Sequence, residues 1–91
     1  MPYVLKYYPG WDKYFDKMDR QVQERIWKKI QQQKEETSLR HLNHGIEFSV
    51  LEIGQYRVAL KIVEKTKEKE IRFSGNHKQY EKWYKNLKKK S

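Results

Sequence analysis

The chain has 91 residues, of which 21 are Lys or Arg and 12 are Asp or Glu, so its formal net charge is +9. This length allows one domain with a thin core, and the absence of cysteine excludes disulfides, thiol catalysis and cysteine-ligated zinc. The positive charge is typical of proteins that bind nucleic acid or an acidic partner. The apolar runs are too short for a membrane segment, and no secretory signal opens the chain, so we expect a cytoplasmic protein.

The first part of the chain predicts one strand and two helices. Tyr3 to Tyr8 is rich in strand-forming residues and stops at Pro9-Gly10. Apolar residues then recur every three or four positions, as on one face of a helix: Trp11, Phe15, Met18, Val22, Ile26 and Ile30. Asp19 can cap a helix inside this run. We therefore expect a short helix, a tight corner and a longer helix over about residues 20–34.

The next part predicts a loop and then a strand. Residues 34–45 show no clear period. Ile46, Phe48 and Val50 then alternate with polar residues, which predicts a strand with one buried face. These three residues are expected to form that face.

A second strand is predicted after a turn at residues 54–55. Its apolar members alternate and share one face: Tyr56, Val58, Leu60 and Ile62. Arg57, Ala59 and Lys61 then point to the opposite face.

A third strand follows the charged connection at residues 64–69. Ile71 and Phe73 repeat the apolar alternation, so three antiparallel strands are expected in a row. If both join the apolar face, Arg72 lies on the opposite one with the cations of the second strand. Buried cations are costly unless they are paired, so we expect that face to meet solvent or an anionic ligand.

A last helix is predicted from Asn76, which can cap it, with Gln79 completing a capping box. A stripe of ring-bearing and apolar residues follows at helical spacing, with Trp83 beside it: His77, Tyr80, Tyr84 and Leu87. Lysines occupy the outward face: Lys78, Lys82, Lys85 and the run from Lys88 to Lys90. The order β-α-α-β-β-β-α predicts one α+β domain over residues 1–91. We expect an antiparallel-dominated sheet with a helical hairpin on one face and a short C-terminal helix.

These residues favour chemistry on RNA. His41 and His44 have no acidic ligand cluster near them in sequence, so no metal is expected. RNA supplies its own nucleophile, the 2′-hydroxyl, so cleavage needs a base, an acid and a cation to stabilise the phosphorane charge. Arg57, Lys61 and Arg72 can supply that charge without a metal or other cofactor.

Each candidate also has a simpler structural interpretation. Cations on strands are commonly solvated, and a lysine run is commonly a solvated face. His77 can be a packed or capping residue, and the aromatics of the last helix can belong to the core.

The order of elements and two segments, IGQYRVALKI and FSGNHKQYEKWY, resemble the RelE/ParE superfamily of prokaryotic toxin–antitoxin systems. The resemblance is closest to the RelE and HigB branches and covers nearly the whole chain. Its motifs are a Trp and a Phe in the first helix, the Arg40–Leu42 segment, the Tyr56-Arg57 pair and the Gly-x-His-x-x-Tyr pattern from Gly75 to Tyr80.

This resemblance implies a ribosome-dependent mRNA endonuclease that works in the ribosomal A site without a metal. It also implies a cognate acidic antitoxin, RelB-like or HigA-like, that blocks the toxin. Arg57 is implied to hold the scissile phosphate, and His77 to act as base or acid. Tyr80 or Tyr84 is implied to stack on a base or to assist proton transfer.

The chain departs from RelE on the strand that includes Phe48 to Val50, where RelE carries lysines. Lys61 and Arg72 can replace that charge, and Glu52 can serve as the base, so the general base stays open. The resemblance implies Arg40 and His41 as flanking RNA contacts. Four further cations are candidate RNA contacts because of their charge: Arg72, Lys78, Lys82 and Lys85.

Two alternatives remain from the sequence. The ParE branch shares the fold but poisons DNA gyrase, so the chain can be a non-catalytic toxin-fold protein or an inactive antitoxin-binding homologue. A generic RNA-binding accessory protein of the ribosome has the same charge.

Overall fold

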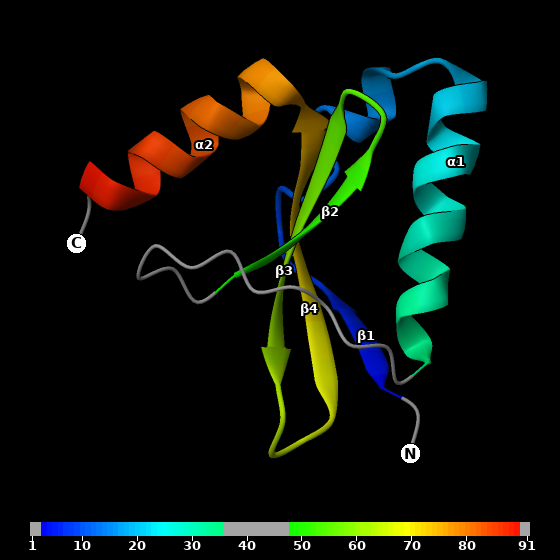
Figure 1. Ribbon diagram of the computed structural model, residues 1–91, viewed down its shortest axis with the longest axis vertical. Helices are drawn as coiled ribbons and strands as arrows, with labels where there is room; N and C mark the ends of the chain where they lie inside the picture. Colours follow the sequence, from blue (N-terminus) through cyan, green and yellow to red (C-terminus); the bar gives the residue numbers. More distant parts are fainter. Residues whose placement is uncertain (1–2, 36–47, 90–91) are drawn as a thin grey trace.

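The computed structural model describes residues 3–35 and 48–89 (Figure 1). Its elements are β1 (Val4–Tyr7), the 3-10 turn η1 (Phe15–Lys17), α1 (Arg20–Gln31), the 3-10 turn η2 (Gln32–Lys34), β2 (Ser49–Ile53), β3 (Tyr56–Val63), β4 (Glu68–Asn76) and α2 (His77–Lys89). The predicted α+β class is confirmed. Most of the loop predicted over residues 34–45 lies outside the described residues.

The four strands form one mixed sheet in the order β1-β4-β3-β2. β1 pairs with β4 in parallel, while β2, β3 and β4 pair antiparallel in succession, as predicted. Figure 1 shows α1 and α2 on opposite sides of this sheet. None of the helices in the described ranges is long and apolar enough to cross a membrane.

The helical hairpin is less regular than predicted. The short first helix is one 3-10 turn, η1, and α1 begins directly after Asp19, the expected cap position. The Asp19 carboxylate makes no capping hydrogen bond. Instead, the Gln23 side chain donates from Nε2 to the Phe15 carbonyl at 2.7 Å, which ties the corner from the helix side.

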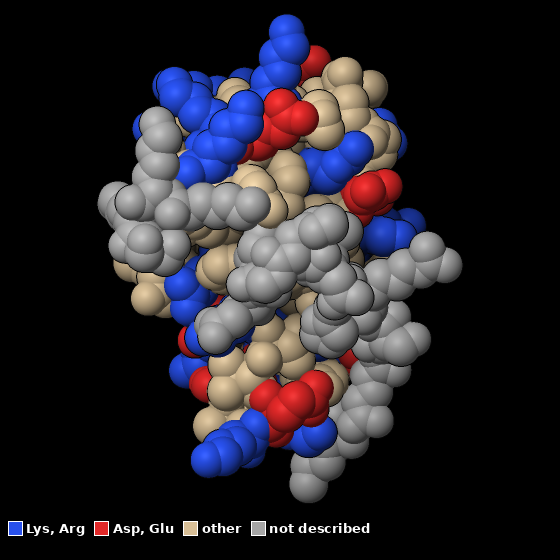
Figure 2. Space-filling model, turned by 60° about the vertical axis from the view of Figure 1, so that its left-hand side comes forward, with Lys and Arg blue, Asp and Glu red and all other residues tan. Residues whose placement is uncertain are grey.

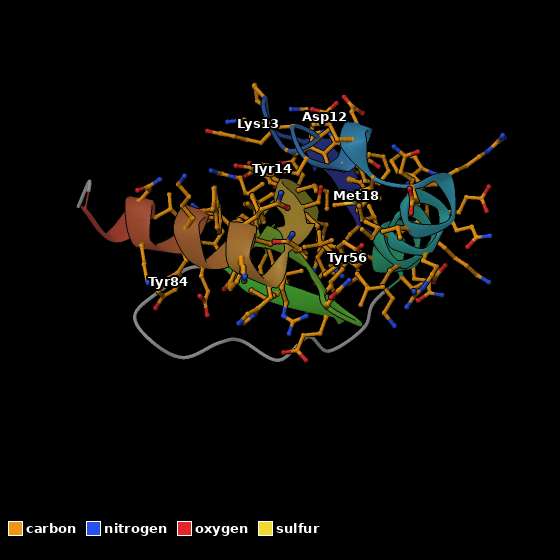
Figure 3. All side chains as sticks on the ribbon, turned by 90° about the horizontal axis from the view of Figure 1, so that it is seen from above. Asp12, Lys13, Tyr14, Met18, Tyr56 and Tyr84 are labelled. Atoms are coloured by element: carbon orange, nitrogen blue, oxygen red, sulfur yellow. The ribbon has the colours of Figure 1, made fainter. Side chains whose placement is uncertain are left out.

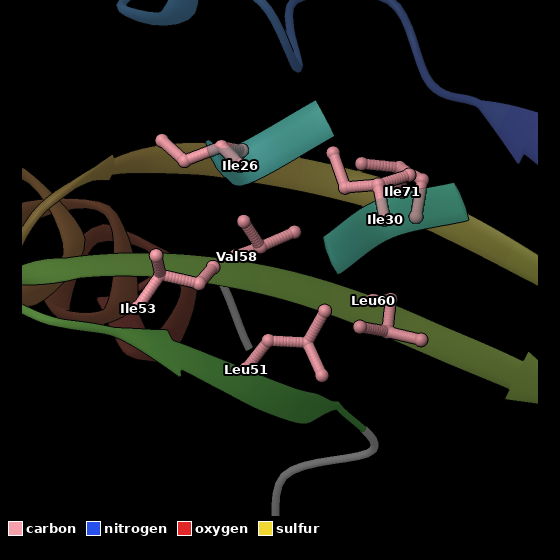
Figure 4. Packing of buried hydrophobic residues seen from close by; sticks show 7 residues of the cluster. All are labelled: Ile26, Ile30, Leu51, Ile53, Val58, Leu60 and Ile71. Carbon is pink, nitrogen blue, oxygen red and sulfur yellow. The ribbon is translucent and has the colours of Figure 1, made fainter. Parts of the chain in front are cut away.

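The core lies between α1 and the sheet (Figure 4). Its buried members are Ile26, Ile30, Leu51, Ile53, Val58, Leu60 and Ile71. The other members of the predicted helical stripe pack against this cluster: Trp11, Phe15, Met18 and Val22. Full burial of one such aliphatic side chain stabilises the fold by about 1.5–3 kcal/mol. The face of the sheet under α1 is therefore filled, and the opposite face is the one that can carry a site.

The buried residues of β2 are the odd-numbered ones and not the even-numbered ones that were predicted. Ser49, Leu51 and Ile53 are buried and pair with Leu60, Val58 and Tyr56 of the core side. Phe48 and Val50 are half-buried, and Phe48 contacts Trp83 of α2. The prediction that Phe48 and Val50 form the one buried face of this strand is wrong, and Ile46, the third residue of that prediction, lies outside the described residues. Val50 and the preceding Phe48 are partly covered on the second face, so this segment carries apolar residues in both parities and alternation alone cannot choose between them.

A β-bulge in β4 changes the faces of its residues. Ala59 pairs with Phe73 but the next residue of β3, Leu60, pairs with Ile71, so Arg72 has no partner in the register. An extra residue on one strand breaks the alternation of side chains. Ile71 consequently joins the α1 core, while Phe73 packs under α2. The expectation that both lie on one face is wrong.

Lys69 is a fully buried cation at the N-terminal end of β4. Its Nζ lies 4.3 Å from the centroid of the Tyr3 ring and 3.4 Å from the Glu35 carbonyl oxygen. Burial lowers the pKa of Lys69 below its ordinary 10.5, and the charge of Glu64 partly offsets this effect. A carbonyl and a ring compensate a buried charge only in part.

We expect Lys69→Met to raise the free energy of unfolding by about 1 kcal/mol at pH 7, because an apolar side chain of similar length replaces a desolvated charge. The burial penalty is full below the folded-state pKa of Lys69. As pH rises from that pKa towards 10.5, the folded state releases the proton first, so the wild type gains stability and the difference shrinks. Urea unfolding of both proteins at several pH values measures this. A Met variant that is less stable at pH 7 would contradict the prediction.

Candidate functional site

A capping box fixes the start of α2 at the end of β4. The backbone N–H of Gln79 donates to Oδ1 of Asn76 at 2.8 Å, and the backbone N–H of Asn76 donates to Oε1 of Gln79 at 2.9 Å. This confirms the predicted box. The backbone N–H of His77 donates to the Gln55 carbonyl at 2.9 Å, so the first residue of α2 is tied to the β2–β3 turn.

Gly75 permits this junction because it has no side chain. An added Cβ would lie 2.7 Å from the Phe73 ring and 2.9 Å from Oε1 of Gln79, too close for either neighbour. Gly75 also pairs with Arg57 in the sheet register. The glycine of the Gly-x-His pattern therefore has a packing reason.

Aromatic rings dock α2 onto the sheet. The buried Phe73 ring is stacked on Trp83 at 5.1 Å between centroids and lies 6.2 Å from Tyr80. Trp83 also meets Phe48 of the β2 side at 5.4 Å, edge to face. These contacts match the expectation that the aromatics of the last helix pack it against the sheet.

This docking leaves a flank on each side of α2. At 100° per residue, Lys82 and Asn86 lie on one side of the docked stripe, and His77 and Tyr84 lie on the other. In Figure 3, Tyr84 lies on one side of the α2 ribbon while Lys13 and Tyr14 lie on the opposite side. We call the side with Glu52, Arg57, His77, Tyr80, Glu81 and Tyr84 the Arg57 flank. The side with Lys13, Tyr14, Arg72, Lys82 and Asn86 is the Arg72 flank.

Arg57 is held at the β2–β3 turn. It is half-buried, and its Nη1 donates to the carbonyl oxygens of Gly54 and Tyr56, both at 2.8 Å. Its partner across β2 is Glu52, which is exposed. Both backbone hydrogen bonds are made by Nη1, so this nitrogen orients the guanidinium, and Nε and Nη2 take no part in these two bonds.

Tyr80 and Tyr84 lie next to each other on α2, with ring centroids 6.1 Å apart. Burial raises the pKa of the Tyr80 phenol, the neighbouring Tyr84 raises it further, and the charge of Arg57 lowers it. The Tyr80 hydroxyl is therefore protonated at neutral pH and can donate a hydrogen bond. The influence of Arg57 on this phenol also places the two residues in one electrostatic neighbourhood.

His77 faces outward from the first turn of α2. Its side chain is 55% exposed, and Nε2 lies 2.9 Å from Oε1 of Glu81, a distance at which a protonated Nε2 donates to the carboxylate. An imidazole oriented by a carboxylate is a common arrangement for proton transfer. Glu81 was not among the predicted residues, although its i, i+4 spacing from His77 was visible in the sequence.

Arg72 lies on the other flank, where the bulge places it. Its guanidinium is paired with Glu70, with Nη2 to Oε1 at 2.5 Å, and it stacks over the Tyr8 ring at 3.6 Å. Lys61 is opposite Glu70 in the register. Because Arg57 and Lys61 are four residues apart on β3, about 13 Å separates them along the strand. The structure does not bring the three predicted cations into one cluster.

The predicted lysines of α2 are exposed: Lys78, Lys82 and Lys85. Figure 2 brings the α2 side forward and shows Lys and Arg side chains gathered at its upper end, with acidic side chains among them. Arg40 and His41 lie outside the described residues. Within residues 3–35 and 48–89, no three His, Asp or Glu side chains group as metal ligands.

No protein-family model matches the chain, and no curated protein matches it in sequence. Its structure is similar to that of a mutant of the Escherichia coli toxin RelE in the free state, with a TM-score of 0.77, 17% identity and coverage of 98% of both chains. It is also similar to a chain of the RelBE2 toxin–antitoxin complex from Mycobacterium tuberculosis, with a TM-score of 0.74, 12% identity and coverage of 84% of this chain and 99% of that one. A chain of the archaeal RelE–RelB complex from Pyrococcus horikoshii gives a TM-score of 0.67 at 16% identity, covering 85% of this chain and 97% of that one. The chain therefore has the RelE fold.

Proposed function

We propose that this chain is the toxin of a toxin–antitoxin pair and that it cuts mRNA on the ribosome at the Arg57 flank. The RelE fold supports the toxin class. The observation that carries the chemistry is the arrangement of Arg57, Tyr80 and His77 at one corner, where β3 begins and β4 passes into α2. A cation, a neutral phenol and an imidazole can supply the positive charge and the proton transfers that RNA cleavage needs.

The proposed reaction is attack of the RNA 2′-hydroxyl on the adjacent phosphorus. A bond from O2′ to phosphorus forms while the bond from phosphorus to O5′ breaks, which leaves a 2′,3′-cyclic phosphate and a 5′-hydroxyl end. A general base takes the proton from O2′, and a general acid gives a proton to O5′. Negative charge that builds on the phosphorane oxygens needs a fixed cation.

Arg57 fits the charge-stabilising role because its guanidinium is fixed by the turn and can bind phosphate oxygens. His77 fits the role of acid or base, with Glu81 orienting the ring. Tyr80 can donate from its protonated hydroxyl, and Tyr84 beside it can stack on a base. Glu52, across from Arg57 and exposed, is the alternative base.

The charge of the chain supports an RNA target. A net charge of +9 attracts polyanions over a distance, and the exposed lysines of α2 lie on the helix that borders the Arg57 flank. We place the protein in the cytoplasm, with the ribosomal A site and its mRNA as the target.

The same charge supports a cognate acidic antitoxin as the partner, RelB-like or HigA-like. Two of the similar structures are toxin–antitoxin complexes, RelBE2 and the archaeal RelE–RelB pair. An acidic partner that covers a basic surface also stabilises the folded toxin by mass action.

Induced expression followed by primer extension on cellular mRNA tests the function. We expect growth to stop and new 5′ ends to appear inside translated codons, and we expect His77→Ala to reduce both effects at equal soluble protein level. The matched control is Lys28→Ala, an exposed α1 residue on the other side of the sheet, which should behave as the wild type.

Other outcomes point to other functions. Intact mRNA together with DNA-damage signalling would favour the gyrase-poison alternative. Normal growth with intact mRNA would favour a homologue that only binds its antitoxin.

A further inference from the structure

We propose that the pocket on the Arg72 flank binds one nucleotide, at a site separate from the Arg57 flank. The pocket has a volume of about 290 Å³ and lies between the loop after β1 and the side of α2. Its lining residues come from three parts of the chain: Pro9, Gly10, Lys13 and Tyr14 of the loop, Arg72 and Phe73 of β4, and Lys82, Trp83 and Asn86 of α2.

The lining is cationic. Lys13, Arg72 and Lys82 belong to it, and no Asp or Glu does. Lys13 and Lys82 are exposed, so their ammonium groups can move to meet a phosphate. Arg72 is held at the wall by Glu70 and Tyr8. Because the Glu70 carboxylate offsets its charge, the two lysines supply the net positive charge of the pocket.

The lining is also aromatic. Tyr14 meets the Phe73 ring edge to face at 5.8 Å, and Trp83 stacks on the same Phe73 ring. Flat rings beside cations suit a nucleobase attached to a phosphate, because bases stack on aromatic side chains whatever their sequence. The Asn86 amide can both donate to and accept from a base edge.

The size favours a nucleotide over an acidic peptide. Pockets for small ligands start at about 300 Å³, which suits one nucleotide, whereas a peptide helix needs an extended groove. An acidic peptide would satisfy the lysines but would make no use of the stacked rings.

The bulge in β4 creates this pocket. Without it, Arg72 and Phe73 would point to opposite faces of the sheet. With it, both line the same pocket under α2. That the bound nucleotide belongs to RNA rests on the proposed function. That the cations and rings of the pocket suit a nucleotide does not.

Titration followed by NMR of the Trp83 indole N–H tests the site in the full chain. The probes are uridine and adenosine 5′-monophosphate, and a single-stranded 2′-O-methyl RNA hexamer, which cannot be cut because its nucleophile is blocked. We expect the Trp83 signal to shift while Trp27, which lies on α1, stays in place. A shift with either monophosphate as well as with the hexamer indicates that a free nucleotide suffices, and a shift with the hexamer alone indicates that the polymer is the ligand.

The combined variant Lys13→Ala and Lys82→Ala should weaken hexamer binding about tenfold at low salt and lower its salt dependence, since two phosphate contacts are lost. The matched control, Lys28→Ala with Lys29→Ala, removes two exposed lysines of α1 and should bind as the wild type.

Several results would overturn the site. These are an unmoved Trp83 signal, equal binding by the two double variants, or a Trp83 shift with hexaglutamate but not with nucleotides. If the protein does not cut mRNA but the Trp83 signal still shifts with nucleotides, the proposed function is refuted and this pocket remains a nucleotide site.

Discussion

Arg57→Ala is expected to lower the rate of mRNA cleavage about 10²–10³-fold, the usual effect of removing a fixed group that stabilises transition-state charge. Nη1 of Arg57 is held by two backbone carbonyls at 2.8 Å, so the guanidinium is oriented before RNA arrives. Arg57→Lys should recover only part of the rate, because an ammonium cannot bind two phosphate oxygens in one plane. Single-turnover cleavage of mRNA in programmed ribosomes measures both rates.

A control must distinguish a loss of catalysis from a disruption of the β2–β3 turn that holds Arg57. Arg25 of α1 lies beside the same turn from the other side, since its Nη2 would be 3.5 Å from a Cβ added at Gly54. Arg25→Ala should keep the cleavage rate within a few-fold of the wild type. If Arg57→Ala cleaves as fast as Arg25→Ala at equal folded fraction, Arg57 does not stabilise the transition state.

Phe73→Ala is expected to lower the free energy of unfolding by about 3–5 kcal/mol, as for other large aromatic side chains removed from a core. Phe73 is 3% exposed and contacts Tyr14, Tyr80 and Trp83, so its loss empties the space between β4 and α2. Domains have a total stability of about 5–15 kcal/mol. Urea unfolding followed by circular dichroism measures the loss.

Val4→Ala is the matched control for apolar truncation, since Val4 is a strand residue that is 56% exposed. Its effect should stay within about 0.5 kcal/mol. A loss of less than about 1 kcal/mol for Phe73→Ala would show that α2 is not docked through this ring.

Local patterns were enough to predict most elements. The apolar stripe of α1 reaches the core because every third or fourth residue of a helix shares a face, and Ile26 and Ile30 are fully buried. The capping box at Asn76 and Gln79 acts between neighbours in sequence, so it could be predicted without knowledge of the fold. The three antiparallel strands in succession follow from short turns between alternating segments.

The sides of the sheet could not be predicted in the same way. Alternation shows that a strand has two faces, but it does not show which face is buried when apolar residues occur on both, as at Val50 and Leu51 of β2. A bulge has no local signature here, yet one extra residue at Arg72 moves Phe73 from one face to the other.

Sequence alone therefore sets the class of this protein: a small basic α+β chain with a histidine at the first turn of its last helix and an arginine at the start of a central strand. Folding decides which charged groups meet. The strand register places Arg57 beside Gly75, close to the start of α2 at His77. The bulge in β4 and the docking of α2 place Arg72 on the other flank. These juxtapositions depend on contacts between residues far apart in the chain, so they follow from packing and not from local periodicity.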